Sequence, residues 1–165
     1  MQKVNCLQGK RRNIAFFLTA LLVVVADQLS KTWIRSNFAM GQALPEEGFF
    51  RLTHVHNYGA AFGLFQGQTF ILIIVALAGV AVILLYAFFI YRQFPFLENV
   101  LGKLALGLVL GGTVGNLIDR LRLGYVTDFI GIGIWPSFNI ADSAVTVGII
   151  IVAYSLLRQV QAEKQ

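Results

Sequence analysis

Four aspartates are the residues of this sequence whose types and positions could support chemistry. Asp27 lies inside the first apolar segment, and Asp119, Asp128 and Asp142 lie in the glycine-rich, largely apolar stretch 111–143. The glutamates are instead found in polar loops or tails: Glu46, Glu47, Glu98 and Glu163. A carboxylate at membrane depth costs at least ~2.5 kcal/mol. Each of these aspartates therefore indicates a functional site with a partner to be found.

Two neighbouring carboxylates can supply a general acid and a general base, because both cannot ionise cheaply and one is held protonated. Such a pair can direct water onto a peptide carbonyl without a metal or a covalent nucleophile. Asp128 and Asp142 have no basic neighbour in the sequence, and the glycines and Pro136 between them allow the chain to turn back. We therefore predict that these two aspartates form the catalytic pair.

The other two aspartates have basic neighbours, which favour the charged carboxylate. Asp27 precedes Lys31 by four residues, so the two share a helix face. They form either an ion pair at the wet end of a helix or a support for the site. Asp119 and Arg120 are either a helix cap with a headgroup anchor or, with Asn116, the polar wall of a substrate groove.

Other hydrolytic chemistries find little support. The sequence contains no His-Glu-x-x-His or Gly-x-Ser-x-Gly motif, and its single cysteine, Cys6, lies in a polar N-terminal tail. His54 and His56 lack a third ligand type nearby, whereas zinc sites need three or four ligands. We expect neither a metal nor another cofactor.

The composition is that of an integral membrane protein. Of 165 residues, 57% are hydrophobic and 13% are charged, whereas a soluble domain has about 25% charged residues. The mean hydropathy is +0.72. The net charge of +5 comes from basic residues dispersed among apolar segments, so we interpret them as topology signals and headgroup contacts, with no nucleic-acid partner.

We expect an all-α membrane fold of four transmembrane helices in one domain, 1–165. The predicted spans are about 14–34, 70–91, 104–118 and 138–157. The first is a retained span and not a cleaved signal peptide, because Asp-Gln follows its apolar run and three more apolar segments come later. Gly111-x-x-x-Gly115 predicts close packing of the third helix.

Two segments outside the spans are rich in strand-forming residues and predict a small extracytoplasmic β-element: 49–56 and 124–138. The first would place on one face Phe50, Leu52, His54 and His56. The glycine-containing loop 57–69 is a candidate gate for substrate.

Basic residues predict the orientation of the chain. With the N-terminus inside, the cytoplasmic flanks hold eight basic residues and the outer side holds five. Both termini then face the cytoplasm, and all four aspartates fall near the outer ends of their spans or in the outer loop.

Five sequence blocks resemble the signatures of lipoprotein signal peptidase, also called signal peptidase II, a bacterial inner-membrane aspartyl peptidase family. They occur in order across residues 14–157: Asp27-Gln28-x-x-Lys31, Asn57-x-Gly59-Ala60-Ala61-Phe62, Gly115-Asn116-Leu117-x-Asp119-Arg120, Val126-x-Asp128-Phe129-Ile130 and Phe138-Asn139-Ile140-Ala141-Asp142-Ser143.

This resemblance implies cleavage of diacylglyceryl-modified prolipoproteins just before the lipidated cysteine. It implies that Asp128 and Asp142 are catalytic and that the supporting positions are Asp27, Lys31 and Asp119. Residues lining the groove for substrate, and for globomycin-type inhibitors, would be Asn57, Gly59, Asn116, Arg120 and Asn139. We expect a monomer in the inner membrane, with membrane lipid around it and the active site on the periplasmic side.

Two other functions remain to be separated from peptide hydrolysis. A small proton-coupled transporter could use intramembrane carboxylates as a relay, although no inverted repeat or paired interrupted helices are visible. A non-enzymatic scaffold could use the same polar residues only to hold helices together. Hydrolysis of a lipidated peptide in the presence of a chelator would distinguish the peptidase from both.

Overall fold

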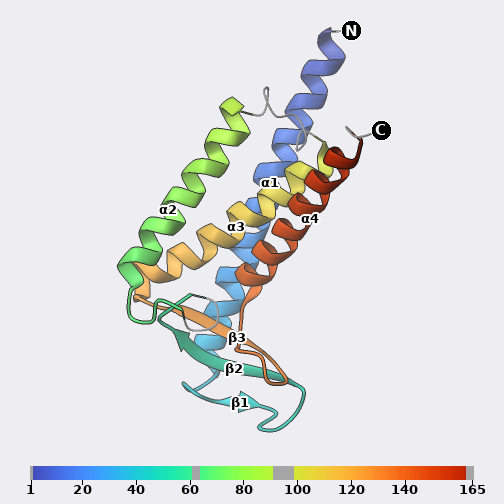
Figure 1. The fold of residues 1–165 in the computed structure, drawn as a ribbon. Coiled ribbons are helices and arrows are strands. Elements are labelled where there is room, and N and C mark those ends of the chain that lie inside the picture. Colours follow the sequence, from blue (N-terminus) through green and yellow to red (C-terminus); the bar gives the residue numbers. More distant parts are fainter. Residues whose placement is uncertain (1, 61–63, 91–98, 163–165) are drawn as a thin grey trace.

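The computed structural model describes residues 2–60, 64–90 and 99–162, which form four long helices and a small sheet (Figure 1). The helices are α1 (Gln2–Asn37), α2 (Thr69–Leu85), α3 (Val100–Leu123) and α4 (Ile140–Ala162). Helix α2 continues as a short π-helix, η2 (Tyr86–Ile90). The strands are β1 (Ala43–Leu44), β2 (Phe50–Asn57) and β3 (Val126–Ile132).

Within the described residues, four helical segments are long and apolar enough to cross a membrane: Asn13–Asn37, Thr69–Phe89, Val100–Leu123 and Ile140–Gln159. The prediction of a membrane protein with four helical spans is therefore confirmed. The sheet lies at one end of the helices, and α1 begins and α4 ends at the other (Figure 1).

The predicted ends of the third span, 104–118, are wrong at both sides. Helix α3 begins earlier because the side chain of Asn99 caps it, accepting a hydrogen bond from the backbone N–H of Gly102 at 2.7 Å. Lys103 is consequently inside the helix and buried. The helix runs on to Leu123, where Gly124 ends it in a left-handed conformation with φ of 80°.

The outer helices also differ from their predicted spans. Helix α1 starts at Gln2, so the polar stretch before residue 14 is helical and continuous with the span. Helix α4 begins at Ile140 and extends to Ala162, past the predicted end at 157. In both cases polar residues extend an apolar helix, and extending a helix costs less than nucleating one. The predicted end of the second span, Tyr91, lies outside the described residues.

Helix α3 is the centre of the bundle, in contact with α1, α2 and α4. In the apolar 18-residue stretch of α3, 56% is buried by the rest of the protein, whereas the buried share of the corresponding stretches in the other three spans is 11–22%. A Cβ atom on Gly111 would lie 2.7 Å from the Ala20 carbonyl oxygen of α1, and one on Gly112 would collide with the Ala141 carbonyl of α4. The predicted close packing is confirmed at Gly111, and also at Gly115, where a Cβ would lie 2.7 Å from Asp27 Oδ2 of α1.

The sheet has the antiparallel order β1-β2-β3, which confirms the two predicted strands and adds a short third one. Leu52 pairs with Ile130 and Val55 with Asp128, so β2 contains one extra residue, a β-bulge. The bulge reverses the alternation of side chains, leaving Leu52 exposed and His54 buried. The predicted common face of Phe50, Leu52, His54 and His56 is therefore wrong.

Candidate active site

Asp128, on β3, and Asp142, in the first turn of α4, are brought to one place by Asn139. The side-chain amide of Asn139 donates to Asp128 Oδ1 at 2.7 Å. Its carbonyl oxygen, Oδ1, accepts from the backbone N–H of Asp142 at 2.9 Å. Asn139 is fully buried, so these bonds have no competition from water. The two aspartates predicted as a pair thus share one amide side chain.

The start of α4 fixes the direction of the Asp142 carboxylate. Asn139 is the residue before the helix, and its bond to the Asp142 N–H caps the first turn. The bond is reciprocated, because Asp142 Oδ2 accepts from the backbone N–H of Asn139 at 3.2 Å. This reciprocal pair is the arrangement known as a capping box. It turns the carboxylate of Asp142 back toward Asn139 and hence toward Asp128.

Two further asparagines hold the carboxylates from the opposite sides. Asn57, at the end of β2, donates to Asp128 Oδ2 at 2.9 Å. Asn116, on α3, donates to Asp142 Oδ1 at 2.7 Å. Each carboxylate therefore accepts one amide N–H on each oxygen. The three asparagines predicted for the groove thus meet at the aspartate pair, but of the three only Asn116 lines the groove itself.

Behind this pair lies a buried ionic cluster, formed by Asp27, Lys31 and Asp119. Lys31 Nζ lies 2.8 Å from Asp27 Oδ2 and 3.3 Å from Asp119 Oδ2. It also donates to Asn116 Oδ1 at 2.8 Å, which leaves the amide nitrogen of Asn116 directed at Asp142. All three charged side chains are at most 1% exposed. Asp27 and Lys31 therefore do form an ion pair, but it is buried in this cluster and does not lie at a wet helix end as predicted.

Asp27 also connects the first helix to the start of the last one. Its Oδ1 accepts a hydrogen bond from the backbone N–H of Ala141 at 2.9 Å. Free N–H groups at a helix start need such acceptors. The carboxylate fits there because Gly115 lacks a side chain: a Cβ at that position would lie 2.7 Å from Asp27 Oδ2. Asp27 thereby fixes α4 one residue before Asp142.

Asp119 and Arg120, neighbours in sequence, have different partners. Asp119 is held by Lys31 and accepts from the backbone N–H of Thr127 at 3.0 Å. Arg120 donates to the carbonyl oxygen of Gly59 at 2.9 Å. Adjacent residues on a helix point in directions about 100° apart, which separates them. Arg120 lies at the groove as predicted, whereas Asp119 belongs to the buried cluster.

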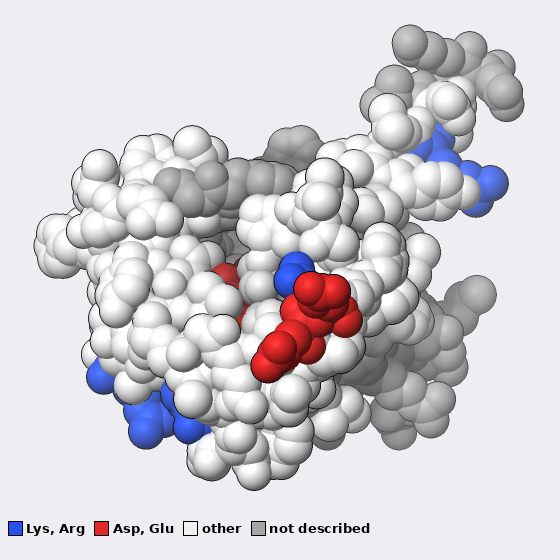
Figure 2. All heavy atoms as spheres, turned by 90° about the horizontal axis from the view of Figure 1, so that it is seen from below, with Lys and Arg blue, Asp and Glu red and all other residues white. Residues whose placement is uncertain are grey.

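A groove of about 910 Å³ opens beside Asp142, between α2, α3, α4 and the loop that follows β3. Its polar lining includes Asn116, Arg120 and Asp142, and most of the remaining wall is apolar, with Leu72, Val75, Val145 and Phe138 among its residues. Seen from the sheet end, Figure 2 shows a small acidic area set back between uncharged atoms, apart from an exposed acidic cluster. The groove can thus hold an apolar segment against a polar end.

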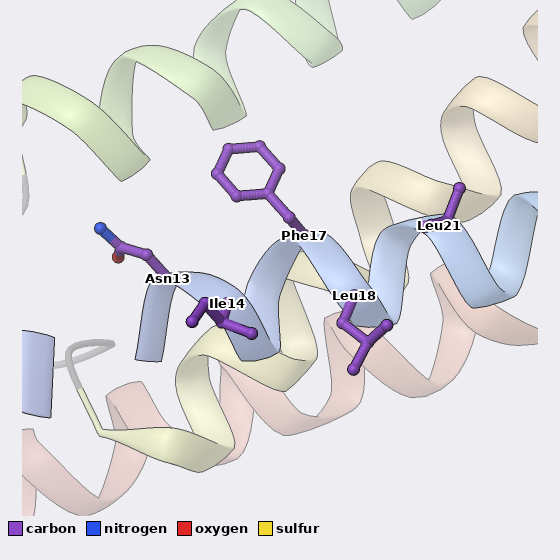
Figure 3. Close-up of a pocket in the computed structure, with 5 residues that line it drawn as sticks. All are labelled: Asn13, Ile14, Phe17, Leu18 and Leu21. Atoms are coloured by element: carbon purple, nitrogen blue, oxygen red, sulfur yellow. The ribbon is translucent and has the colours of Figure 1, made fainter. Parts of the chain in front are cut away.

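A second hollow, of about 420 Å³, lies on the first half of α1 and has no acidic lining (Figure 3). Its side chains are Asn13, Ile14, Phe17, Leu18 and Leu21. They lie about two to four helical turns before Asp27 on the same helix, toward the end opposite the sheet (Figure 1). This hollow therefore takes no part in the carboxylate site.

The environment of Asp128 favours its protonated form. Burial, at 2% exposure, is the largest cause and the nearby Asp142 carboxylate is the next, and together they raise the pKa of Asp128 from 3.8 to about 7. The hydrogen bonds from Asn57 and Asn139 act in the opposite direction. Near neutral pH, the two carboxyl groups can thus share one proton, which is the requirement for one acid and one base.

The two histidines lie on the sheet and have other contacts. His54 is buried, with Nδ1 2.9 Å from the carbonyl oxygen of Phe38. The His56 ring stacks on Tyr125, with centroids 3.7 Å apart. Burial, followed by the charges of His54 and Arg35, lowers the pKa of His56. In the part of the chain that the structure describes, no three His, Cys, Asp or Glu residues are grouped so as to hold a metal ion.

Comparison with protein families identifies the chain. The family model described as signal peptidase (SPase) II matches residues 19–158. The chain belongs to the signal peptidase II family. The match covers all four aspartates and the asparagines that bind them.

Individual members of the signal peptidase II family are similar over most of the chain. A lipoprotein signal peptidase of Dehalococcoides mccartyi is 54% identical over 139 residues, covering 84% of this chain and 86% of the relative. One of Moorella thermoacetica is 52% identical over 143 residues, covering 86% and 92%. A bacterial membrane enzyme solved by the in meso method is 30% identical, with a TM-score of 0.79, covering 91% of this chain and 92% of that one.

In this member of the signal peptidase II family, the sequence analysis gave no role to three polar residues around the ionic cluster. Gln28 donates to Asp119 Oδ1 at 3.2 Å, and Arg35 and Thr127 are joined to each other by a hydrogen bond. One signal was available for Arg35. It follows Asp27 and Lys31 at a spacing of four residues, so the three lie on one face of α1.

Proposed function

We propose that this chain is the endopeptidase that removes the signal peptide from diacylglyceryl-modified prolipoproteins, cleaving just before the lipidated cysteine. Membership of the signal peptidase II family and the names of the relatives support the substrate class. The observation that carries the proposal is the meeting of Asp128 and Asp142 at Asn139, beside a groove.

In the proposed aspartyl mechanism, one carboxylate removes a proton from water as the water attacks the scissile carbonyl. The other carboxyl group protonates the carbonyl oxygen, and the gem-diol collapses as a proton passes to the leaving amine. The raised pKa of Asp128 supports a protonated Asp128 as the starting acid. Asp142, which lines the groove, is then the base. No step requires a metal or another cofactor.

The groove and the polar residues around the aspartate pair have distinct parts in this proposal. The apolar wall of the groove accepts the signal helix, while the polar end of the groove places the scissile bond near Asp142. Asn57, Asn116 and Asn139 hold the two carboxylates at the distances described above. Arg120 offers donors for a substrate carbonyl, and its bond to the Gly59 carbonyl positions the loop beside it. We propose that globomycin-type inhibitors occupy the same groove.

We further propose a location and orientation for the enzyme. The chain is a single-domain monomer in the bacterial inner membrane, with both termini in the cytoplasm. The excess of basic residues on the flanks assigned inside supports this orientation. The sheet and the aspartate pair, at the end of the helices opposite the start of α1, then lie on the periplasmic side (Figure 1). A lipid-anchored cysteine at the bilayer surface would meet the aspartates at that depth.

The test is cleavage of a diacylglyceryl-modified prolipoprotein by the purified chain in detergent with EDTA. Wild type is compared with Asp128→Asn and Asp142→Asn, and with Glu46→Gln, which alters an exposed carboxylate. Thermal melts establish that each variant is folded. We expect cleavage by wild type and Glu46→Gln, and none by the two aspartate variants. Activity in either folded aspartate variant, or loss of wild-type activity in EDTA, would refute the aspartyl mechanism.

A further inference from the structure

Arg35, in the last turn of α1, connects that helix to β3. One guanidinium nitrogen donates to Thr127 Oγ1 at 3.0 Å and lies 3.7 Å from Asp119 Oδ1. Another donates to Thr32 Oγ1, one turn earlier on α1, at 3.0 Å. The side chain is 21% exposed. Both arms of the guanidinium are thus occupied, one by its own helix and one by the strand.

Thr127, the residue before Asp128, is held by each of its polar groups. Its backbone N–H donates to Asp119 Oδ2 at 3.0 Å, and its hydroxyl accepts from Arg35. Its carbonyl oxygen lies 3.4 Å from the side-chain nitrogen of Asn139. The residue is 0% exposed. Residues of α1, α3 and the α4 cap therefore act together with the pairing of Thr127 to His56 of β2 in fixing where this part of β3 lies.

Adjacent side chains on a strand point to opposite faces. Thr127 accordingly points toward Arg35, while Asp128 points toward Asn57 and Asn139. A shift or tilt of the strand at Thr127 moves the Asp128 carboxylate by a similar amount. The contacts on one face of β3 thus control the geometry of the aspartate pair on the other.

Arg35 also balances the charge of the buried cluster. Lys31 is shared between the carboxylates of Asp27 and Asp119, at 2.8 and 3.3 Å. With Lys31 alone, this cluster would carry two negative charges and one positive charge. Arg35 supplies the second positive charge next to Asp119. Its removal would leave a buried carboxylate undercompensated, which is costly.

We propose that Arg35 is a positioning residue for the reaction, which acts through Thr127 to hold Asp128 at the distance where it meets Asn139 and Asp142. This inference rests on the proposed function. The competing explanation is that Arg35 serves only as a positive charge near a helix C-terminus or the membrane interface. In that case its charge matters, while its bond to the Thr127 hydroxyl does not.

The experiment measures kcat and KM for cleavage of a diacylglyceryl-modified prolipoprotein by the full chain in detergent. Arg35→Gln removes both the charge and the two guanidinium donors, whereas Arg35→Lys keeps only the charge. Thr127→Val removes only the hydroxyl, and Thr127→Ser retains it. The double variant Arg35→Gln/Thr127→Val tests whether both changes break one connection. Arg122→Gln, at an exposed arginine in the last turn of α3, is the matched control.

We expect Arg35→Gln and Thr127→Val each to lower kcat roughly tenfold, because small misplacements of a catalytic group are costly. KM should change by less than about twofold, since neither residue lines the groove. The double variant should be no slower than Arg35→Gln. Arg35→Lys should be slower than wild type, whereas Thr127→Ser and Arg122→Gln should match it.

Full activity of Thr127→Val would overturn the inference even if Arg35→Gln failed to fold, because the hydroxyl is the proposed connection. The inference would also be overturned if the losses of kcat from the two single variants multiplied in the double variant, or if Arg35→Lys were fully active. In these cases, cleavage by wild type leaves the proposed function intact. A wild-type chain that does not cleave the substrate overturns the proposed function and this inference together.

Discussion

Replacement of Asp128 by asparagine should stabilise the fold increasingly as the pH rises, although under the proposed mechanism it should abolish cleavage. In the folded chain, burial and the Asp142 carboxylate raise the pKa of Asp128 to about 7 from an ordinary value of 3.8. A carboxyl group whose folded-state pKa lies above its unfolded value favours folding while it is protonated. That stability is fully present below pH 4 and is lost as the pH rises to about 7.

The size of this loss follows from the same pKa. Each unit corresponds to 1.36 kcal/mol, so wild type should lose at most about 4 kcal/mol between pH 4 and pH 8. Structure retained in the denatured chain in detergent reduces this difference, and we expect about half of it. The asparagine places an amide N–H against a donor from Asn57 or Asn139, which costs about 1–3 kcal/mol at every pH. The pH dependence therefore isolates the carboxyl group.

The assay is the melting temperature of wild type and Asp128→Asn in detergent at pH 4 and pH 8. A change of about 2 kcal/mol corresponds to about 4–8 °C in a chain of this size, so the variant should gain that much on wild type between the two pH values. Glu46→Gln, at an exposed carboxylate, should show no such gain. An Asp128→Asn difference that is the same at both pH values would refute the reasoning.

Three further outcomes are expected. When chemistry limits the rate, cleavage should fall about tenfold per pH unit above about pH 7, as Asp128 loses its proton; a flat profile from pH 5 to 9 would contradict this. Gly112→Ala should lower the melting temperature by about 2–10 °C through collision with the Ala141 carbonyl, whereas Gly79→Ala, with open space around it, should not. Lys31→Met should destabilise the chain by about 3–5 kcal/mol in denaturant unfolding, and adding Asp27→Asn should recover part of the loss.

The membrane architecture could be predicted from the sequence because a long apolar segment by itself indicates that it lies in a membrane. A helix of about 20 apolar residues needs no knowledge of its neighbours to be recognised. The ends of the helices were harder to predict from the sequence, since they depend on caps such as Asn99 before α3 and Gly124 after it. The β2 bulge was also hidden, because strand alternation in one sequence does not reveal an extra residue relative to the partner strand.

The candidate site was predicted as a set of residues, but not as a set of contacts. The spacing of Asp128 and Asp142, together with the family motifs, indicated the pair. Their connection through Asn139 depends on the geometry of a helix start. The bond from Ala141 N–H to Asp27 joins residues 114 positions apart, which no local pattern encodes. Closeness in sequence was a poor guide for Asp119, because its carboxylate is paired with Lys31 and not with the adjacent Arg120.

The cap that Asp27 provides for α4 has a consequence for the order of assembly. The first span supplies the acceptor for a backbone N–H at the start of the last span, directly beside Asp142. A nascent chain that has inserted only its first three spans contains Asp27, Asn116 and Asp128 but not Asn139 or Asp142. Under the proposed aspartyl mechanism, catalysis therefore requires the fourth span to reach the first. Under the same mechanism, a chain that has not yet inserted its fourth span would be unable to cleave a substrate.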